Sequence, residues 1–444
     1  MTKPMEPKPA TVSDTTKQAG EIRARWAWVE PQVWTDRMLT ALENGVKGGK
    51  WFSLMDKICS VRNLRKAFTR VKANKGAAGV DHQTIEMFEN HLDENLEKLS
   101  LGLKDGTYRP KAVRRRWIPK PGSKEQRPLG IPTVRDRVVQ GAMRSVLEPI
   151  FERDFAEQSY GFRPRRGCKD ALRRVKALLD AGYTWVVDAD IKSYFDTIPH
   201  QPLLKRMSAK VADGMVLSLV DRYLKQSVME TAQGWTSDEG TPQGAVISPL
   251  LSNIYLDPLD HKMLELGFEM LRYADDFVVL CRSEPEANRA LEEVAKWTSS
   301  AGLKLHQDKT RIVDVAHCGG FDFLGYHFEQ GRHRPSRKSL RKLKDTIRSK
   351  TRRSNGNSLQ TIISDVNRTL VGWFGYFKHS YIHTFSSLDS WLRMRLRSIL
   401  RKRRGGKGRG RGRDHHRWPN AFFAGQGLFS LTAAHAAACQ SSRR

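Results

Sequence analysis

The stretch that most constrains this chain is residues 272–280, which carry two adjacent carboxylates, Asp275 and Asp276, at a tight bend. The apolar residues on either side of the bend predict two buried strands of a hairpin. Adjacent aspartates are costly at the tip of such a hairpin, because their like charges repel and both resist desolvation, unless a cation binds them. A divalent metal is the candidate cation. A solvated Asp-Asp turn is the alternative, and other stretches decide between the two.

The chain has 444 residues, of which 39% are hydrophobic, so it can bury a sizeable core and should form two or three subdomains. No run approaches the roughly 18 apolar residues of a membrane span, and the N-terminal segment lacks the apolar core of a signal peptide. We therefore expect a cytoplasmic protein with no membrane partner. The five cysteines contain no CxxC pair, which argues against a disulfide framework and a zinc module.

The net charge of +29 is concentrated towards the C-terminal end. Residues 332–417 hold 25 Lys or Arg against 4 Asp or Glu, which places +21 of the net charge in 86 residues. Such a balance indicates a polyanionic partner. A membrane surface is the competing use of this charge, but the interleaved aromatic residues favour nucleic acid. Residues 401–417, whose cations are spaced by glycines, are predicted to be flexible until they meet phosphate.

Hydrophobic periodicity predicts mixed helices and strands up to about residue 335 and helices alone beyond it. Residues 1–20 are polar and aperiodic and are predicted to be disordered, and Asp36 is the expected cap of an early helix. Strands are expected at 186–191, on both sides of residues 275–276, around 321–326, and as a strand–turn–strand within 114–131. Helices are expected at about 83–104, 135–155, 201–229 and 285–301, with three more after residue 335.

A second acidic element lies far upstream of the hairpin. Asp190 ends the apolar strand at 186–191, so the chain offers carboxylates on two separate elements. Metal-assisted nucleotidyl transfer needs this arrangement, because two Mg²⁺ ions roughly 3.5–4 Å apart are bridged while they hold the attacking 3′ oxygen and the departing pyrophosphate. Magnesium prefers oxygen ligands. Asp190, Asp275 and Asp276 are therefore candidate catalytic and metal-binding residues.

Six motifs occur in a fixed order along the chain. They are Arg-Pro-Leu-Gly-Ile-Pro at 127–132, Gln-Ser-Tyr-Gly-Phe-Arg-Pro at 158–164, the acidic strand at 187–196, Gly-Thr-Pro-Gln-Gly at 240–244 with the residues to 250, Tyr-Ala-Asp-Asp at 273–276 and Gly-Trp-Phe-Gly-Tyr-Phe at 372–377. Over about residues 63–429 the chain resembles the reverse transcriptase/maturase proteins encoded by bacterial group II introns. In that family these motifs form, in order, two parts of the fingers, the first metal-binding motif, the template and nucleotide motif, the catalytic tetrad and the maturase, or thumb, signature.

The resemblance implies a role for each matched residue in the palm. Asp190 and Asp275 would be the main metal ligands, with Asp276 accompanying them and the carbonyl of Ile191 as a further oxygen. Phe195 would stack under the sugar and exclude a 2′-hydroxyl, although an aromatic residue beside a strand is, taken alone, more often core.

The resemblance also implies a set of nucleotide-binding residues. Lys120 and Arg127 would grip the triphosphate as a cation fork, with Lys124 a nearby substitute for Lys120. Gln243 would contact the incoming nucleotide or the template, and its Pro-Gln-Gly setting is also simply a turn. Lys309 would donate a proton to the leaving pyrophosphate, with a solvated lysine as the alternative.

Primer and template contacts follow from the same resemblance. Phe323, Leu324 and Gly325 look like the primer grip, where backbone groups would do the holding. The aromatic residues at 373–377 are expected in the core of the thumb. The candidate phosphate contacts, whose binding should weaken steeply with salt, are Arg393, Arg395, Arg397, Arg401, Lys402, Arg403 and Arg404.

We therefore predict an α+β right-hand polymerase, with fingers and an antiparallel palm sheet, followed by an all-helical thumb. The expected divisions are an N-terminal extension (1–50), fingers and palm (51–330), a thumb or maturase domain (331–400) and a basic nucleic-acid-binding tail (401–444). The predicted function is RNA-directed DNA synthesis from dNTPs with Mg²⁺, joined to binding of group II intron RNA to assist splicing and retrohoming. The other predicted partners are an RNA template with a DNA primer and target DNA.

Three alternatives remain open: a splicing-only RNA-binding maturase, an RNA-dependent RNA polymerase, and a free-standing reverse transcriptase unconnected with an intron. Phe195 argues against the second, and only the flanking DNA addresses the third. Family members with a DNA endonuclease end in a His- and Cys-rich module, whereas this tail offers His415, His416, His435 and Cys439 without a Cys pair. We expect no endonuclease, so mobility would need a primer from a nascent strand or a nick.

Overall fold

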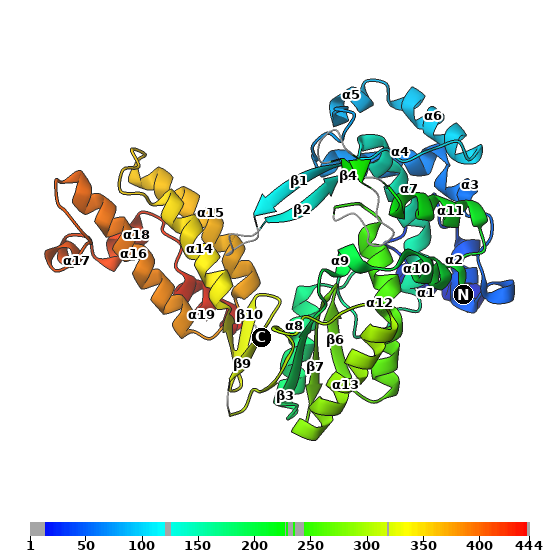
Figure 1. Ribbon diagram of the computed structural model, residues 1–444. Coiled ribbons are helices and arrows are strands. Elements are labelled where there is room, and N and C mark those ends of the chain that lie inside the picture. The colour runs from blue at the N-terminus through cyan, green and yellow to red at the C-terminus, as the bar shows by residue number, and fades with distance from the viewer. Residues whose placement is uncertain are drawn as a thin grey trace, which may run out of the picture.

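The computed structural model describes residues 14–119, 126–226, 228–229, 234–235, 244–317 and 319–441. A body of mixed helices and strands is followed by a helical arm, and together they form a U (Figure 1). The predicted fold class, α+β followed by an all-helical part, is confirmed. Within the described ranges, no helix is long and apolar enough to cross a bilayer.

The arm of the U that belongs to the mixed body is mostly helical and packs around α7 (Val134–Glu152), whose inward side is lined by buried apolar residues such as Val138 and Leu147. Its other helices are α1 (Asp14–Arg25), α2 (Asp36–Asn44), a short 3₁₀ turn (Lys47–Gly49), α3 (Met55–Ile58), α4 (Val61–Ala73), α5 (Ile85–Glu89) and α6 (Leu92–Lys104). The hairpin of β1 (Val113–Pro119) and β2 (Gln126–Ile131) projects from this arm towards the opposite one (Figure 1). Strands β4 (Val228–Met229) and β5 (Gly234–Trp235) extend its sheet in the order β2-β1-β4-β5.

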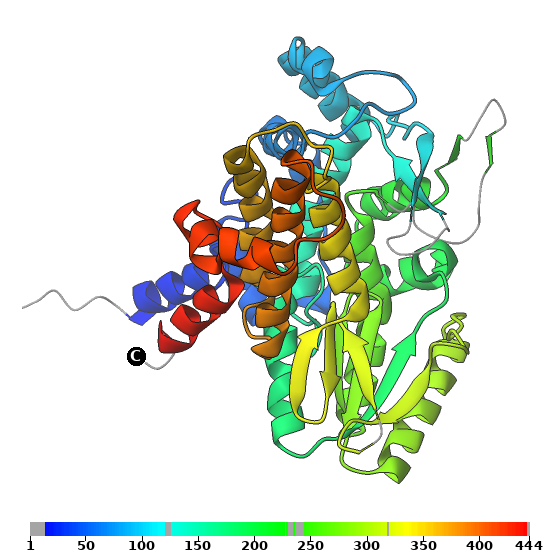
Figure 2. The ribbon, with the colours of Figure 1, turned by 90° about the vertical axis from the view of Figure 1, so that its left-hand side faces the viewer.

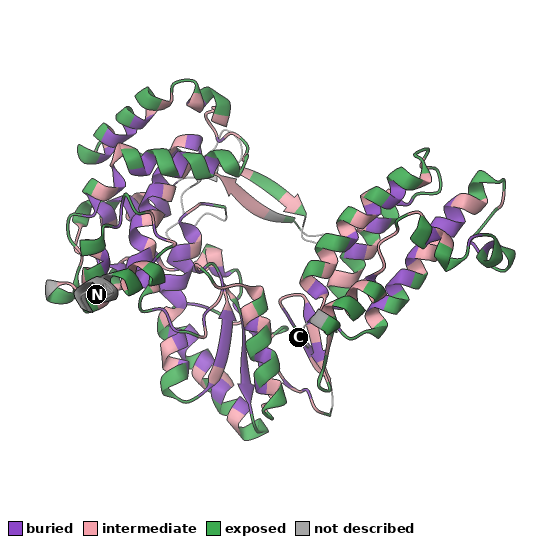
Figure 3. Ribbon diagram, turned by 180° about the vertical axis from the view of Figure 1, so that it is seen from behind, coloured by how far each residue is buried: buried purple, intermediate pink, exposed green. Residues whose placement is uncertain are grey.

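The base of the U is an antiparallel sheet in the order β6-β7-β3-β8. Its strands are β3 (Trp185–Asp190), β6 (Glu269–Tyr273), β7 (Asp276–Cys281) and β8 (Arg311–Asp314). One face packs on α12 (Ser248–Glu265) and α13 (Glu284–Ser300), and the other on α8 (Cys168–Asp180). Buried residues fill both faces of its central strands (Figure 3). The remaining helices here are α9 (Tyr194–Thr197), α10 (His200–Ser208) and α11 (Gly214–Leu224).

A small antiparallel sheet joins the palm to the helical arm. It consists of β9 (Gly320–Phe323), β10 (Tyr326–Glu329) and β11 (Arg332–Pro335). Above it the helices α14 (Arg337–Lys350), α15 (Leu359–Phe377) and α16 (His383–Arg403) lie side by side around their own apolar core (Figure 2). The three predicted thumb helices are confirmed.

Two long predicted helices are each interrupted, and a predicted cap is wrong. The helix expected at 83–104 breaks where His91 leaves the helical region and begins α6. The helix expected at 201–229 ends at Ser208 and begins again after Asp213, whose carboxylate caps α11 through the N–H groups of Met215 and Val216. Its predicted end is also wrong, because α11 stops at Leu224 and Val228–Met229 form a strand. Near the N-terminus the chain is helical from Asp14, and Thr35, not Asp36, caps the second helix. Residues 1–13 lie outside the described ranges.

The C-terminal segment folds where flexibility was predicted for part of it. Helix α16 continues to Arg403, beyond the expected boundary at 400, and short helices follow after a glycine-rich connection. These are α17 (Arg413–Arg417), α18 (Asn420–Gly425) and α19 (Leu431–Ser441). Buried Asp389 of α16 accepts hydrogen bonds from Ser430 Oγ at 2.9 Å and from the Leu431 and Thr432 N–H groups, which docks α19 on the arm.

Replacing Asp389 by Ala should release α19, because three donors at its start lose a buried acceptor. We expect a loss of stability of about 1–2 kcal/mol and faster amide exchange confined to residues 428–441. Hydrogen–deuterium exchange measures this. Asp345→Ala, which removes an exposed carboxylate on α14, is the control and should leave the exchange of α19 unchanged. Equal exchange in both variants would contradict the capping role.

Candidate active site

Antiparallel pairing brings the two acidic elements of the sequence together. Asp190 at the end of β3 is in register with Asp276 at the start of β7, and Asp275 precedes Asp276 in the connecting turn. Successive side chains of a strand point to opposite faces, so Asp188 and Asp190 share the face of Val186, which packs towards α8. The structure thus gathers the three predicted carboxylates at one end of the palm sheet, with Asp188 beside them.

The turn that carries Asp275 is held in an unfavourable backbone conformation. Ala274 has φ 62°, in the left-handed region, which costs an ordinary residue roughly 1–2 kcal/mol. Arg272 Nη1 donates a hydrogen bond to the Ala274 carbonyl at 2.9 Å. On the other side lies Gly161, where an added Cβ would come 2.1 Å from the Ala274 nitrogen. The turn is therefore clamped between a buried cation and a position that only glycine fits.

Arg272 is fully buried and forms an ion pair with Asp260 of α12, with Nη2 2.5 Å from Oδ2. Burial opposes the charge of Arg272, but the carboxylate of Asp260 outweighs it and raises the pKa of the guanidinium. Arg272 Nη1 also donates to Asn253 Oδ1 at 2.9 Å, and Asn253 Nδ2 donates to the Gly161 carbonyl at 2.9 Å. One buried charge thus joins β6, α12 and the segment at 158–162, whose backbone pairs with that of Arg272.

The neighbouring carboxylates repel one another electrostatically. The pKa of Asp276 is raised to about 7, first because surrounding protein displaces water from it, and then because Asp188, Asp275 and Asp190 bring like charge near it. Asp276 is nevertheless exposed to solvent, so a cation can approach its carboxylate although protein atoms surround much of it. A cation that neutralises the cluster would stabilise the ionised form of such a carboxylate.

Lys309 supplies one cation to this cluster. Its Nζ lies 2.5 Å from Asp190 Oδ2, which was not predicted, since the sequence suggested contact with pyrophosphate. The loop that carries Lys309 is docked on the end of β3, because the His306 N–H donates to the Asp190 carbonyl at 2.7 Å. The carbonyl of Asp190 is thus engaged, and Ile191 pairs with Leu305 of the same loop.

The donor set fits a hard divalent metal in chemistry, since it consists of carboxylate oxygens that like-charge repulsion makes receptive to a cation. Among the described residues, however, no three His, Cys, Asp or Glu side chains converge closely enough to form a metal cage. The ammonium of Lys309 occupies Asp190 instead. Binding of a metal therefore requires Lys309 to leave Asp190 and the carboxylates to draw together.

The sugar-side residue Phe195 lies on α9, directly after Asp190 and the turn at 191–193. It is half-buried, and its ring packs edge-on against Tyr194 with the ring centres 5.5 Å apart. Tyr194 is fully buried and donates to the Ser252 carbonyl at 2.7 Å, which anchors α9 on α12. Tyr194 is thus core, whereas Phe195 packs against the core with part of its side chain still exposed.

The predicted triphosphate contacts are described only in part. Lys120 and Gln243 lie outside the described residues, and so does Lys124. Arg127 lies on β2, with its backbone paired to Ile118. The two paired strands expected within 114–131 are confirmed, whereas the turn predicted between them lies outside the described residues. The roles of these side chains stay predictions.

The predicted primer grip, Phe323 to Gly325, forms the tip of the β9–β10 hairpin. Leu324 and Gly325 have φ values of 48° and 81°, as a two-residue hairpin turn with matching twist requires. The backbone N–H of Leu324 lies close enough to the Asp276 carboxylate to lower its pKa, against the larger effects that raise it. The tip of this hairpin therefore lies beside the carboxylate cluster, and its role as a primer grip stays a prediction.

The predicted phosphate contacts in the thumb differ in their access to solvent. Arg397 is buried and donates to the Trp418 carbonyl and to Asn420 Oδ1, which leaves it no access to phosphate here. Arg395 donates to Thr351, and Arg401 pairs with Asp414 at 2.7 Å. The exposed members are Lys402, Arg403 and Arg404, while Arg393 is half-exposed.

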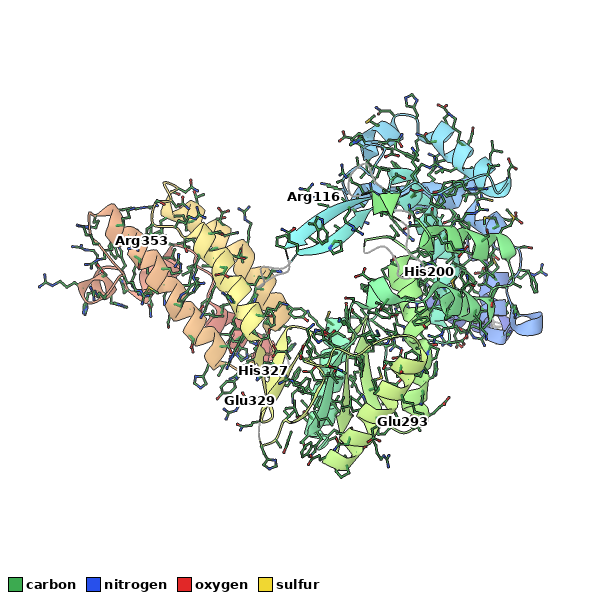
Figure 4. The ribbon with its side chains drawn as sticks, viewed as in Figure 1. Arg116, His200, Glu293, His327, Glu329 and Arg353 are labelled. Carbon is green, nitrogen blue, oxygen red and sulfur yellow. The ribbon has the colours of Figure 1, made fainter. Side chains whose placement is uncertain are left out.

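Cations on α14 are additional candidates that the sequence reasoning missed. The exposed ones are Arg337, Lys338, Arg341, Lys342 and Arg348, on the face opposite Leu343 and Ile347. Their signal was present in the sequence, because cations alternate there with apolar residues at helical spacing. Arg116 lies on the hairpin that projects towards the helical arm, and Arg353 lies on that arm, where it donates to the Gly408 carbonyl at 3.2 Å (Figure 4).

Asp188, Asp260 and Asn253 were also missed. Asp188 stood inside the quoted acidic strand, two residues before Asp190, which is the spacing that keeps both on one face. Its carboxylate pairs with Arg311 of β8 at 3.2 Å. Asp260 and Asn253 gave no separate signal, since they are polar residues on a helix that the sequence marks only as apolar.

Comparison with known proteins agrees with this geometry. Residues 118–328 match the family model "Reverse transcriptase (RNA-dependent DNA polymerase)", and residues 340–418 match "Group II intron, maturase-specific domain". The chain is 34% identical to protein YkfC of Escherichia coli K12 over 352 residues, covering 70% of this chain and 87% of YkfC. It is 39% identical over 249 residues to the group II intron-encoded protein LtrA of Lactococcus lactis, covering 56% of this chain and 40% of LtrA.

Among solved structures, a partial Cas6-RT-Cas1–Cas2 complex matches with a TM-score of 0.35 and 22% identity, over 55% of this chain and 42% of that one. A match at this level adds nothing to the assignment. The sequence matches and the palm define the class, a metal-dependent RNA-directed DNA polymerase with a maturase-specific domain. The chain belongs to the family of group II intron-encoded reverse transcriptase/maturases.

Replacing Asp260 by Asn should destabilise the palm by about 3–5 kcal/mol, because it leaves the buried charge of Arg272 without its partner. Urea unfolding measures this through the transition midpoint. Glu293→Gln is the control, since Glu293 lies on the outer side of α13 in a half-exposed ion pair with Lys262 (Figure 4). That variant should unfold with the wild type. A midpoint for Asp260→Asn equal to that of Glu293→Gln would contradict the clamping role.

Proposed function

We propose that the carboxylates at the end of the palm sheet bind Mg²⁺ and extend a DNA primer on an RNA template. The observation that carries the proposal is the in-register pairing of Asp190 on β3 with Asp276 on β7, while Asp275 lies in the turn that joins β6 to β7. When bound, the metal pair would activate the primer 3′ oxygen and neutralise charge on the departing pyrophosphate. Asp190 and Asp275 would hold it, with Asp276 and the Ile191 carbonyl beside them.

Other residues of the chain would orient the substrates. Lys309 would exchange its bond to Asp190 for the pyrophosphate, to which its ammonium can give a proton. Lys120 and Arg127 would hold the triphosphate, and Gln243 the nucleotide or template. The backbone at 323–325 would hold the primer end beside Asp276. Phe195 would close the sugar side against a 2′-hydroxyl.

The partner we propose for the basic arm is the RNA of the group II intron, since the maturase-specific match covers residues 340–418, where the positive charge is concentrated. Exposed cations of α14 and the end of α16 would contact its phosphates. Splicing assistance and retrohoming into target DNA follow as proposals, with the primer supplied by a nascent strand or a nick. Absence of an endonuclease module and a cytoplasmic location stay predictions.

Asp190→Asn and Asp276→Asn should each lower DNA synthesis by about 10³-fold or more, because several kcal/mol of charge stabilisation at the metal are lost. Primer extension by the purified protein on an RNA template, with dNTPs and Mg²⁺, measures this. Asp180→Asn, at the exposed end of α8, is the control and should keep wild-type activity. No incorporation by the wild type, with splicing preserved, would instead identify a splicing-only maturase.

Replacing Phe195 by Ala should raise ribonucleotide use relative to deoxyribonucleotide use by about tenfold, because the sterically closed sugar side opens. Single-nucleotide incorporation with matched rNTP and dNTP measures the ratio. Phe52→Ala is the control, because it removes a highly exposed ring in the segment before α3, and it should leave the ratio unchanged. An unchanged ratio in Phe195→Ala would remove Phe195 from this role and reopen the RNA polymerase alternative.

A further inference from the structure

An exposed aromatic side chain lies directly beside the Tyr-Ala-Asp-Asp motif at 273–276. Phe162, in the segment that connects α7 to α8, keeps 42% of its surface exposed. Its ring centre lies 6.5 Å from that of Tyr273, the first residue of the motif. Phe162 belongs to the Gln-Ser-Tyr-Gly-Phe-Arg-Pro motif at 158–164, and neither the family resemblance nor the proposed function gives this residue a task.

The backbone of Phe162 has a conformation that a bulky residue rarely adopts. Its φ is 60°, in the left-handed region where the Cβ atom crowds the following carbonyl oxygen. Glycine avoids this crowding, and asparagine tolerates the conformation better than phenylalanine does. An exposed ring also gains little from the hydrophobic effect in the unbound protein. Phe162 therefore costs stability twice, and residues held at such a cost tend to cluster at functional sites.

The two neighbours of Phe162 in the chain prevent its backbone from relaxing. On one side, Gly161 lies so close to the turn of the motif that an added Cβ would come 2.1 Å from the Ala274 nitrogen. On the other side, Arg163 is buried and forms an ion pair with Glu152, with Nη2 2.8 Å from Oε1. The ring is therefore presented from a rigid position, as a preorganised contact with a ligand requires.

The ring of Phe162 borders the side of the palm sheet where the carboxylates gather. Tyr273 is directly opposite Asp276 in the β6–β7 register, and residues opposite each other in a sheet share a face. Asp276 is in turn opposite Asp190 on β3. Under the proposed function the growing end of the duplex lies over this face, so Phe162 lies beside the place that the last base pair would occupy.

The chemistry of the ring selects the part of a nucleic acid that it can contact. An uncharged aromatic ring fits sugars and bases, whereas phosphates need cations. Every base has a π-face, so such a contact tolerates any sequence, as the copying of varied templates requires. We propose that Phe162 is a contact residue for the template–primer duplex, whose ring packs against a sugar or base of the terminal pair and holds it beside the carboxylates. The proposal rests on the proposed function, in which the duplex end lies at this site.

Phe162→Asn tests the proposal, because it removes the ring and at the same time relieves the strained backbone. Phe162→Tyr keeps the ring and provides the rescue. Phe52→Asn is the matched control, since it replaces a ring that is 64% exposed in the segment before α3. Fluorescence anisotropy without dNTP measures the Kd of each variant for an RNA–DNA template–primer. Primer extension measures kcat and the KM for dNTP, and thermal unfolding gives the midpoint.

We expect Phe162→Asn to raise the Kd for template–primer about tenfold, the effect of one lost aromatic contact with a nucleotide, while kcat and the KM for dNTP change less than about threefold. Its unfolding midpoint should equal or exceed that of the wild type. Phe52→Asn should bind as the wild type does, and Phe162→Tyr should recover most of the affinity. An unchanged Kd, a raised KM for dNTP alone, or a lowered unfolding midpoint in Phe162→Asn would overturn the inference alone. A wild type that incorporates no dNTP, but whose Kd still depends on Phe162, would overturn the proposed function and not the contact.

Discussion

The ion pair between Arg272 and Asp260 is the interaction on which the palm depends. Both side chains are fully buried, and the guanidinium reaches the carbonyl of Ala274 in the turn that presents Asp275. Without it the left-handed turn would lose its main polar support, and the segment at 158–162 would lose its link through Asn253. A buried pair of this kind contributes less to net stability than to a single arrangement of the elements it joins.

That arrangement concentrates negative charge at one point of a strongly basic chain. Four carboxylates lie at one end of the sheet, those of Asp188, Asp190, Asp275 and Asp276. Three of them have different surroundings. Arg311 pairs with Asp188 and Lys309 with Asp190, whereas the pKa of Asp276 is raised by burial and by its acidic neighbours. Tyr376 of α15 donates its hydroxyl hydrogen to the Leu324 carbonyl, so the helical arm is hydrogen-bonded to the hairpin that lies beside this cluster.

Much of this was predictable because strong local patterns encode it. The acidic strand and the Tyr-Ala-Asp-Asp bend were visible as apolar runs that end in carboxylates. Pairing of the two strands is the simplest arrangement that buries both apolar runs and brings their carboxylates together. What could not be predicted depends on contacts between distant residues. Asp213 and His91 break helices that periodicity alone continues, and Arg397 faces inwards although it sits in a basic run. Residues 401–417 were predicted to be flexible, but the ion pair between Arg401 and Asp414 and the hydrogen bond from Arg397 to the Trp418 carbonyl fold this segment back on α16.

The most direct test of the account is the structure of the protein bound to an RNA template, a DNA primer, a non-reactive dNTP analogue and Mg²⁺. The account predicts Mg²⁺ within about 2.1 Å of oxygens from Asp190 and Asp275, with Lys309 released from Asp190 and turned to the phosphates. Metal bound away from these carboxylates, or an intact ion pair between Lys309 and Asp190 in the loaded complex, would contradict it.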